Sequence, residues 1–256
     1  MKILPAVKSI LISVILFTLA AGPAFSEVPD LEKAEKYASN LPVEVIEKIP
    51  LPKGYHEGLY FDGKYVWVSN GKKGNTWVVD PATRAIVSEI ESVGPFTEGI
   101  TSAGDGTYWV TDWEEKKLYR VKIEEGRMIA EYDISLEPSH PTGVVWTGEK
   151  LYIITWTRSA MGTTYHLMQL NKEEHMSREM RIKRIYEPAH MVWDGKHLWI
   201  TSWYSQRVYK VDVNTFRVLG SFESPAKDTT GIAWDGEYFW ITGTYAALYK
   251  IKVGEK

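Results

Sequence analysis

The stretch Thr230-Gly-Ile-Ala-Trp-Asp-Gly236 decides the fold, because four similar stretches precede it in the chain. These are Glu57-Gly-Leu-Tyr-Phe-Asp-Gly63, Glu98-Gly-Ile-Thr-Ser-Ala-Gly104, Thr142-Gly-Val-Val-Trp-Thr-Gly148 and Ala189-His-Met-Val-Trp-Asp-Gly195. They recur at intervals of roughly 40 to 48 residues, a period typical of the blades of a β-propeller. A second apolar run follows each of them, so every repeat begins with two predicted strands.

Each repeat is predicted to contain four short antiparallel strands. The Asp-Gly pairs at 62–63, 194–195 and 235–236 lie between the first two apolar runs, and this dipeptide favours a tight hairpin turn. In the fourth repeat a third run covers 208–211, and a turn at 212–215 leads to a last run over 217–222. Four such strands make one propeller blade.

The two ends of the chain predict how the ring closes. The fifth repeat stops at Lys256 without its last strand, whereas residues 43–49 alternate like a strand and stand ahead of the first repeat. If this strand completes the last blade, no long open edge remains. The sequence therefore predicts an all-β fold: a single five-bladed β-propeller over residues 43–256, built of four-stranded antiparallel blades. The third repeat is the longest, and its extra residues at 158–165 and 171–184 are predicted to be protruding loops.

The first 26 residues are typical of a secretory signal peptide. Lys2 and Lys8 precede an apolar run over 10–20, which is too short for a stable membrane span, and small residues at Ala24 and Ser26 favour cleavage after Ser26. We therefore expect a secreted or periplasmic protein without stable membrane insertion; the alternative is a retained anchor. Residues 27–42 are expected to form a lead, either disordered or a short helix.

Composition excludes several classes of function. The formal net charge is −3, which gives no reason to expect nucleic-acid binding. The chain has no cysteine, so thiol catalysis and thiolate metal sites are excluded. We expect a monomer that acts on a peptide or another small substrate without a cofactor, with a structural or channel-bound divalent cation as an open alternative.

Propeller geometry sorts the candidate functional residues onto one face. The Asp-Gly turns lie on one side, and we expect that side to carry only residues that form turns. The starts of the inner strands and the ends of the second strands lie on the other side, where a pocket with aromatic walls and a few polar groups is the usual pattern of a ligand site. The predicted site residues on that face are His56, Glu57, Asn70, Glu98, Trp113, Trp156, His190, Trp203, Thr244 and Tyr245.

Several of these residues allow a second interpretation. Glu57 and Glu98 precede the repeat glycine near the narrow channel, where burial of a carboxylate is costly, so they are functional, metal-bound or salt-bridged. The tryptophans either line a pocket or pack between blades. His190 stands in place of the repeat glycine, and a single histidine is more often structural.

Three stretches carry a resemblance to a known family: Phe96-Thr-Glu-Gly-Ile100, His56-Glu-Gly-Leu-Tyr-Phe-Asp-Gly63 and Trp203-Tyr-Ser-Gln-Arg-Val-Tyr-Lys-Val-Asp212. They resemble the glutaminyl-peptide cyclotransferases of plant and bacterial type, over nearly the whole mature chain. The resemblance implies a five-bladed propeller that converts N-terminal glutamine to pyroglutamate, releases ammonia and needs no catalytic metal. It implies that Glu98 is the catalytic glutamate, that Trp203 is a substrate-site tryptophan and that Trp113 falls near another.

The chain departs from the family pattern at four places. Glu57 stands where the family usually has glutamine, and Ala189-His190 replaces an asparagine-glutamate pair. Pro141-Thr142 replaces a tryptophan, and Thr244 replaces a lysine.

Three functions follow as hypotheses. The first is cyclisation of N-terminal glutamine, with Glu98 as acid–base and a nearby Glu57 raising one pKa. The second is a binding propeller that holds a peptide, sugar or metal against the tryptophans. The third is a metal-dependent lyase that uses Glu and His190.

Overall fold

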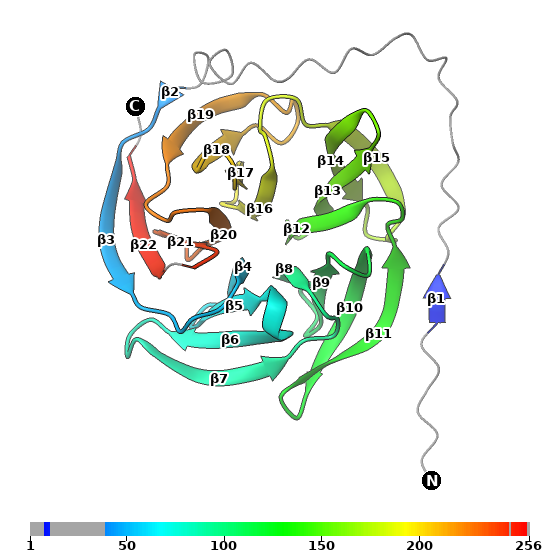
Figure 1. Ribbon diagram of the computed structural model, residues 1–256, viewed down its shortest axis with the longest axis horizontal. Coiled ribbons are helices and arrows are strands. Elements are labelled where there is room, and N and C mark those ends of the chain that lie inside the picture. Colours follow the sequence, from blue (N-terminus) through cyan, green and yellow to red (C-terminus); the bar gives the residue numbers. More distant parts are fainter. Residues whose placement is uncertain (1–7, 11–38, 246, 255–256) are drawn as a thin grey trace.

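The computed structural model describes residues 8–10, 39–245 and 247–254, which form five four-stranded antiparallel units around a common centre (Figure 1). Each unit runs outward from an inner strand near the centre. The first comprises β4 (His56–Phe61), β5 (Val66–Asn70), β6 (Asn75–Asp80) and β7 (Ala85–Glu91), and the second β8 (Thr97–Ser102), β9 (Tyr108–Asp112), β10 (Lys117–Glu124) and β11 (Arg127–Ser135). The third comprises β12 (His140–Trp146), β13 (Leu151–Ser159), β14 (Gly162–Leu170) and β15 (Met176–Arg181), and the fourth β16 (Pro188–Trp193), β17 (Leu198–Ser202), β18 (Arg207–Val211) and β19 (Val218–Glu223). The fifth contains β20 (Thr229–Trp234), β21 (Phe239–Gly243) and β22 (Leu248–Val253). The all-β propeller class is confirmed.

The fifth unit takes its outer strand from the other end of the chain. β3 (Val43–Ile49) pairs antiparallel with β22, with Ile49 opposite Leu248 and Val43 opposite Val253. The predicted closure of the ring by residues 43–49 is thus confirmed. Two shorter segments lie parallel to outer edges: β1 (Lys8–Ile10) beside β11, and β2 (Ser39–Asn40) beside β19.

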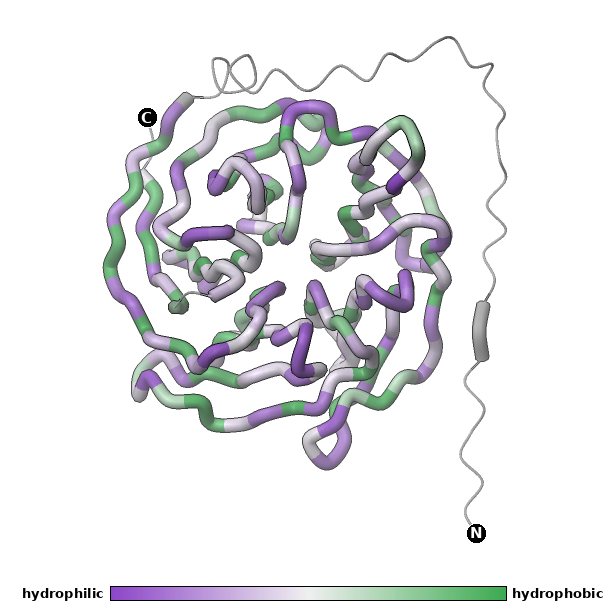
Figure 2. Tube along the Cα trace, in the orientation of Figure 1, coloured by the Kyte–Doolittle hydropathy of each residue, from purple (hydrophilic) through white to green (hydrophobic). Residues whose placement is uncertain are grey.

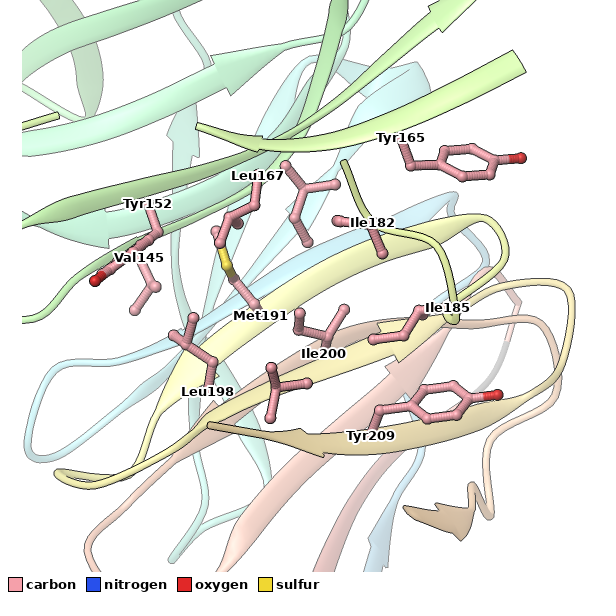
Figure 3. Packing of buried hydrophobic residues seen from close by; sticks show 12 residues of the cluster. Val145, Tyr152, Tyr165, Leu167, Ile182, Ile185, Met191, Leu198, Ile200 and Tyr209 are labelled. Carbon is pink, nitrogen blue, oxygen red and sulfur yellow. The ribbon is translucent and has the colours of Figure 1, made fainter. Parts of the chain in front are cut away.

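In four of the five units the second strand has the largest share of buried residues. All five residues of β5, of β17 and of β21 are buried, because neighbouring units cover both faces of these strands. Outer strands such as β3 instead alternate between hydrophobic and hydrophilic residues (Figure 2). One core cluster joins the third and fourth units, where Tyr152, Leu167 and Met191 pack near Ile200 (Figure 3).

Two predictions for the third repeat are wrong. Residues 171–184 are not a loop, because they contain β15, the fourth strand of this unit. Residues 158–165 continue the β13–β14 hairpin as paired strand around a turn, with Arg158 opposite Thr163. The third repeat is long because its hairpin is longer.

The predicted signal peptide and the lead at 27–42 lie outside the described residues, apart from β1 and residues 39–42. Within the described ranges, no helix has the length and apolar character needed to cross a membrane. One 3-10 turn, η1 (Gly71–Lys73), follows β5.

Candidate active site

A cavity of about 410 Å³ opens on the face where the inner strands begin and the second strands end. Its walls come from four of the five units, and the floor comes from the first residues of the inner strands. The lining residues are Tyr55, Glu57, Phe96, Glu98, Trp113, Glu114, Thr142, Trp156, Arg158, Glu187, Ala189, Trp203 and Thr230. The structure therefore brings together Glu57, Glu98 and the three predicted tryptophans, as the sequence predicts.

A β-bulge in every inner strand directs residues towards this cavity. The register between inner and second strand shifts at the same place in all five units, for example between His56 and Leu59 and between Thr97 and Ile100. Bulges are frequent beside active sites because they re-aim a side chain and interrupt pairing. Here the interruption falls on Glu57 in β4 and on Glu98 in β8.

In four of the five units a glycine follows the bulged position and lets the inner strands meet backbone to backbone. A Cβ on Gly58 would lie 2.3 Å from the carbonyl oxygen of Glu98, and one on Gly231 would lie 2.3 Å from that of Glu57. No side chain fits in such a gap. The close approach brings adjacent inner strands together and sets Glu57 beside Glu98.

The side chains of Glu57 and Glu98 are hydrogen-bonded to each other. Glu57 is 6% exposed, whereas Glu98 keeps part of its surface open to the cavity. Burial raises the pKa of Glu98 to about 8, an effect that the hydrogen bond from Glu57 opposes and the nearby Asp112 carboxylate reinforces. The pKa of Glu57 is raised well above its usual range. Burial is the main cause, and the charge of Glu98 and the hydrogen bond to Glu98 add to it. Glu57 is thus the proton donor of the pair, and Glu98 is the acceptor.

Backbone hydrogen bonds fix the loops that carry Trp113 and Trp203. The N–H of Trp113 donates to the carbonyl of Phe96 at 3.0 Å, and the N–H of Trp203 donates to that of Glu187 at 3.0 Å. Asp112 accepts the N–H of Phe96 at 2.7 Å and thereby braces the loop ahead of β8. Each wall residue is therefore tied to the loop that leads into an inner strand.

The tryptophan side chains form one side of the cavity. Trp113 and Trp156 meet edge to face with 5.4 Å between ring centroids, and the indole N–H of Trp156 donates to the carbonyl of Pro188 at 2.7 Å. Trp203 is 40% exposed, and its indole N–H donates to the Thr244 hydroxyl at 3.3 Å. Trp156 also packs against a core cluster, so for this residue both roles considered from the sequence apply.

Five of the ten predicted site residues do not line the cavity, and three of these five are buried within the inner part of the ring. His56 is fully buried, with its Nε2 3.1 Å from the carbonyl oxygen of Pro52 and its ring against Trp77. Asn70, also fully buried, accepts the N–H of Tyr55 at 2.9 Å. The third is His190.

His190 fills space near the ring centre. Its Nδ1 lies 3.2 Å from the carbonyl oxygen and 3.5 Å from the backbone nitrogen of Ile232, and its Nε2 reaches towards Gly58 on the opposite inner strand. Burial lowers the pKa of His190 to about 4, so the imidazole is neutral near neutral pH. His190 is buried where a repeat glycine would leave a gap, which is a packing role. This position gives no support to the lyase hypothesis, which needs His190 beside a bound cation.

Two further predicted residues lie at the margin. Thr244 contacts the cavity only through Trp203. Tyr245 is 72% exposed, and its ring meets Tyr55 edge to face at 5.8 Å. Within the described ranges, no group of three or more His, Cys, Asp or Glu side chains has the arrangement of a metal site.

Sequence reasoning missed five polar or aromatic lining residues beyond the repeat positions: Tyr55, Phe96, Glu114, Arg158 and Glu187. Tyr55 and Glu187 each precede the start of an inner strand by one residue, so a wider reading of those positions would have found them. Glu187 has φ of 47°, a strained backbone for a residue other than glycine. Burial raises the pKa of its carboxyl, which the guanidinium of Arg158 opposes.

The opposite face is not limited to turns. There a cavity of about 520 Å³ lies between the second and third units. In the first, fourth and fifth units a turn aspartate accepts an indole N–H, as Asp194 does from Trp199 at 2.7 Å and Asp235 from Trp240 at 2.9 Å. The second unit has Ala103 at this position, and Trp109 instead has the guanidinium of Arg120 over its ring at 4.7 Å.

The fold and the site together define a β-propeller with a paired-carboxyl cavity walled by tryptophan. The glutamine cyclotransferase family matches residues 13–129, which include the first unit, the second unit up to the start of β11, and both glutamates of the pair. Over these residues the chain is similar to the glutamine cyclotransferase family.

Solved structures agree with the fold. Glutaminyl cyclase from Myxococcus xanthus superposes with a TM-score of 0.69 at 15% identity, over 84% of this chain and 98% of that one. Virginiamycin B lyase from Staphylococcus aureus gives 0.53 at 13% identity, over 83% and 99%. A luciferin-regenerating enzyme gives 0.53 at 12% identity, over 84% and 96%. At these identities the likeness shows the fold alone. Among curated proteins, no sequence matches the chain significantly.

Proposed function

We propose that this protein cyclises N-terminal glutamine to pyroglutamate. The α-amine nitrogen attacks the carbon of its own side-chain amide, a C–N bond forms, and the bond to the amide nitrogen breaks to release ammonia. The observation that carries the proposal is the hydrogen-bonded Glu57–Glu98 pair at the floor of a tryptophan-walled cavity. The similarity of residues 13–129 to the glutamine cyclotransferase family supports the class of reaction.

Glu98 is the acid–base residue in this proposal. As a carboxylate it accepts the proton that the attacking amine loses, and as an acid it delivers that proton to the departing nitrogen. A pKa of about 8 suits both steps, since efficient proton transfer requires a pKa close to the working pH. Glu57 holds its own proton and donates a hydrogen bond that stabilises the Glu98 carboxylate.

The developing oxyanion needs a hydrogen-bond donor. Asn70 was one candidate from the sequence, but its side chain is turned to Tyr55. The indole N–H of Trp113 lines the cavity and donates to no residue that the structure describes, so we assign it this role.

The binding hypothesis remains as a second candidate. The exposed indole of Trp203 and the Trp113 side chain, which lines the same cavity, offer a surface for a ligand that is held and not converted. We further propose that the protein is secreted or periplasmic after removal of residues 1–26, and that it acts as a monomer on peptides without a cofactor.

Ammonia release decides between these candidates. The mature protein is incubated with a peptide amide that carries N-terminal glutamine, and Glu98→Gln is compared with wild type. We expect loss of at least about a hundredfold in kcat, as is typical for removal of an acid–base group. Glu114→Gln, a change of the same kind at the wall of the same cavity, is the control and should keep activity. No turnover by wild type, together with a fluorescence response of the tryptophans to the peptide, would establish the binding function in place of the enzyme.

A further inference from the structure

Arg158 is the one basic residue among the described residues that line the cavity. Four carboxyl groups line the same space: Glu57 and Glu98 at the floor, and Glu114 and Glu187 at the walls. Near neutral pH the floor pair retains protons, since burial raises both pKa values. Above this floor pair, the cavity walls carry the guanidinium of Arg158 and the carboxyl groups of Glu114 and Glu187.

The longest hairpin of the ring places Arg158 there. β13 has nine residues, whereas β5, β9, β17 and β21 have five each. The extra length pairs Thr157 with Thr164, Arg158 with Thr163 and Ser159 with Gly162. A hydrogen bond of 2.6 Å between the hydroxyls of Ser139 and Thr157 ties the extension to the start of β12. The arm that carries the guanidinium is thus a paired strand and not a free loop.

The guanidinium of Arg158 is positioned beside Trp113, and its charge also acts on the carboxyl of Glu187. It lies 5.2 Å from the centre of the Trp113 ring, a distance at which the ring attracts a cation. It forms no hydrogen bond and no ion pair with any residue that the structure describes. Its five N–H donors are therefore available to a ligand, and their planar arrangement fits a carboxylate.

We propose, on the basis of the cyclotransferase function above, that Arg158 binds a carboxylate of the peptide substrate. The reacting N-terminus lies at the floor, and a cavity of about 410 Å³ holds a ligand of only a few residues. The carboxylate belongs either to an acidic side chain at the second or third position or to the C-terminus of a very short peptide. The favoured substrates are short or acidic peptides with N-terminal glutamine.

Two peptide pairs separate these sources. Gln-Glu-Ala-amide against Gln-Gln-Ala-amide tests the side chain, and Gln-Ala-Ala with a free C-terminus against its amide tests the terminus. In at least one pair we expect about tenfold higher kcat/KM for the carboxylate-bearing peptide, the effect of one good charge-assisted contact. The preference should fall as salt is added, because the rim is open to water.

The variant Arg158→Gln should bring that ratio to about one while the uncharged peptides are still turned over. Arg181→Gln, the same change on an exposed residue of β15 outside the cavity, should keep the ratio. A wild-type ratio near one in both pairs overturns the proposal and leaves the cyclotransferase function standing. If no glutamine peptide is turned over, the proposed cyclotransferase function is wrong. The role of Arg158 is then tested by the binding of Ala-Glu-Ala-amide and Ala-Gln-Ala-amide, measured by tryptophan fluorescence. Equal affinities overturn the proposal, whereas tighter binding of the acidic peptide that Arg158→Gln abolishes supports it.

Discussion

The stability of this protein should fall between about pH 5 and pH 8, and Glu98→Gln should reduce the fall. In the folded protein Glu98 keeps its proton until about pH 8, whereas its ordinary pKa is 4.5. Within that window the folded state binds one more proton than the unfolded chain, so the free energy of unfolding decreases as pH rises. Stability from this group is fully present below the unfolded pKa and is lost as pH passes the folded pKa.

The magnitude follows from proton linkage. Each pH unit in the window costs about 1.4 kcal/mol per group, so Glu98 accounts for at most about 4 kcal/mol between pH 5 and pH 8. This is an upper limit, since part of the carboxyl is open to the cavity and water screens its charge. Glu57 adds a second contribution of the same sign, because its pKa is also raised.

Chemical denaturation at several pH values and constant ionic strength tests this linkage. Relative to wild type, Glu98→Gln should gain stability steadily with pH, by no more than about 1.4 kcal/mol per pH unit. The double variant Glu57→Gln/Glu98→Gln should have the flattest profile, and Glu114→Gln should follow wild type. Parallel profiles for wild type and Glu98→Gln would refute the inference that burial holds a proton on this carboxyl.

Two further predictions concern the carboxyl pair and the backbone contact between inner strands beside it. The acidic limb of the kcat/KM profile should lie near pH 8. Glu57→Ala should move this limb to higher pH, because the variant loses a hydrogen bond that lowers the pKa of Glu98. A pH–rate profile measures the shift, and a shift to lower pH contradicts the prediction. Gly231→Ala should lower Tm by several degrees, since its Cβ would lie 2.3 Å from the carbonyl oxygen of Glu57 and overpacking costs about 1–3 kcal/mol. Thermal unfolding by circular dichroism checks it, and an unchanged Tm would show that the inner strands can separate without cost.

The fold could be predicted because its evidence is periodic. Five copies of one stretch fix the inner strands, and a missing fourth strand after Ile251 together with an unassigned strand at 43–49 implies the closure that the β3–β22 pairing confirms. The failures fell where the period is broken. The sequence predicts a loop over residues 171–184 because they lack the apolar alternation of the other fourth strands. The structure has the strand β15 there, and pairing with β14 suffices to form it.

The site was predictable to the extent that repeats place equivalent residues on one face. Glu57, Glu98 and Trp203 follow from position alone. The directions of individual side chains do not, because they depend on neighbouring blades: Asn70 turns to Tyr55, and His190 turns across the ring centre. The position of a residue in the repeat predicts where its Cα atom lies. Packing against the neighbouring blades determines where its side chain points and what that side chain contacts.

The residues of the site thus come from two parts of the fold that differ in rigidity. The carboxyl pair is supplied by inner strands in backbone contact, where Gly58 and Gly231 tolerate no side chain, so its geometry changes only if the ring itself changes. Arg158 is supplied by an extension that only the third unit has, beyond the ring's common strands. Alteration of that extension leaves the pair in place, so the proton chemistry and the choice of substrate can vary separately. A variant with the hairpin shortened to the length of β9 should therefore lose the carboxylate preference and retain turnover of uncharged glutamine peptides.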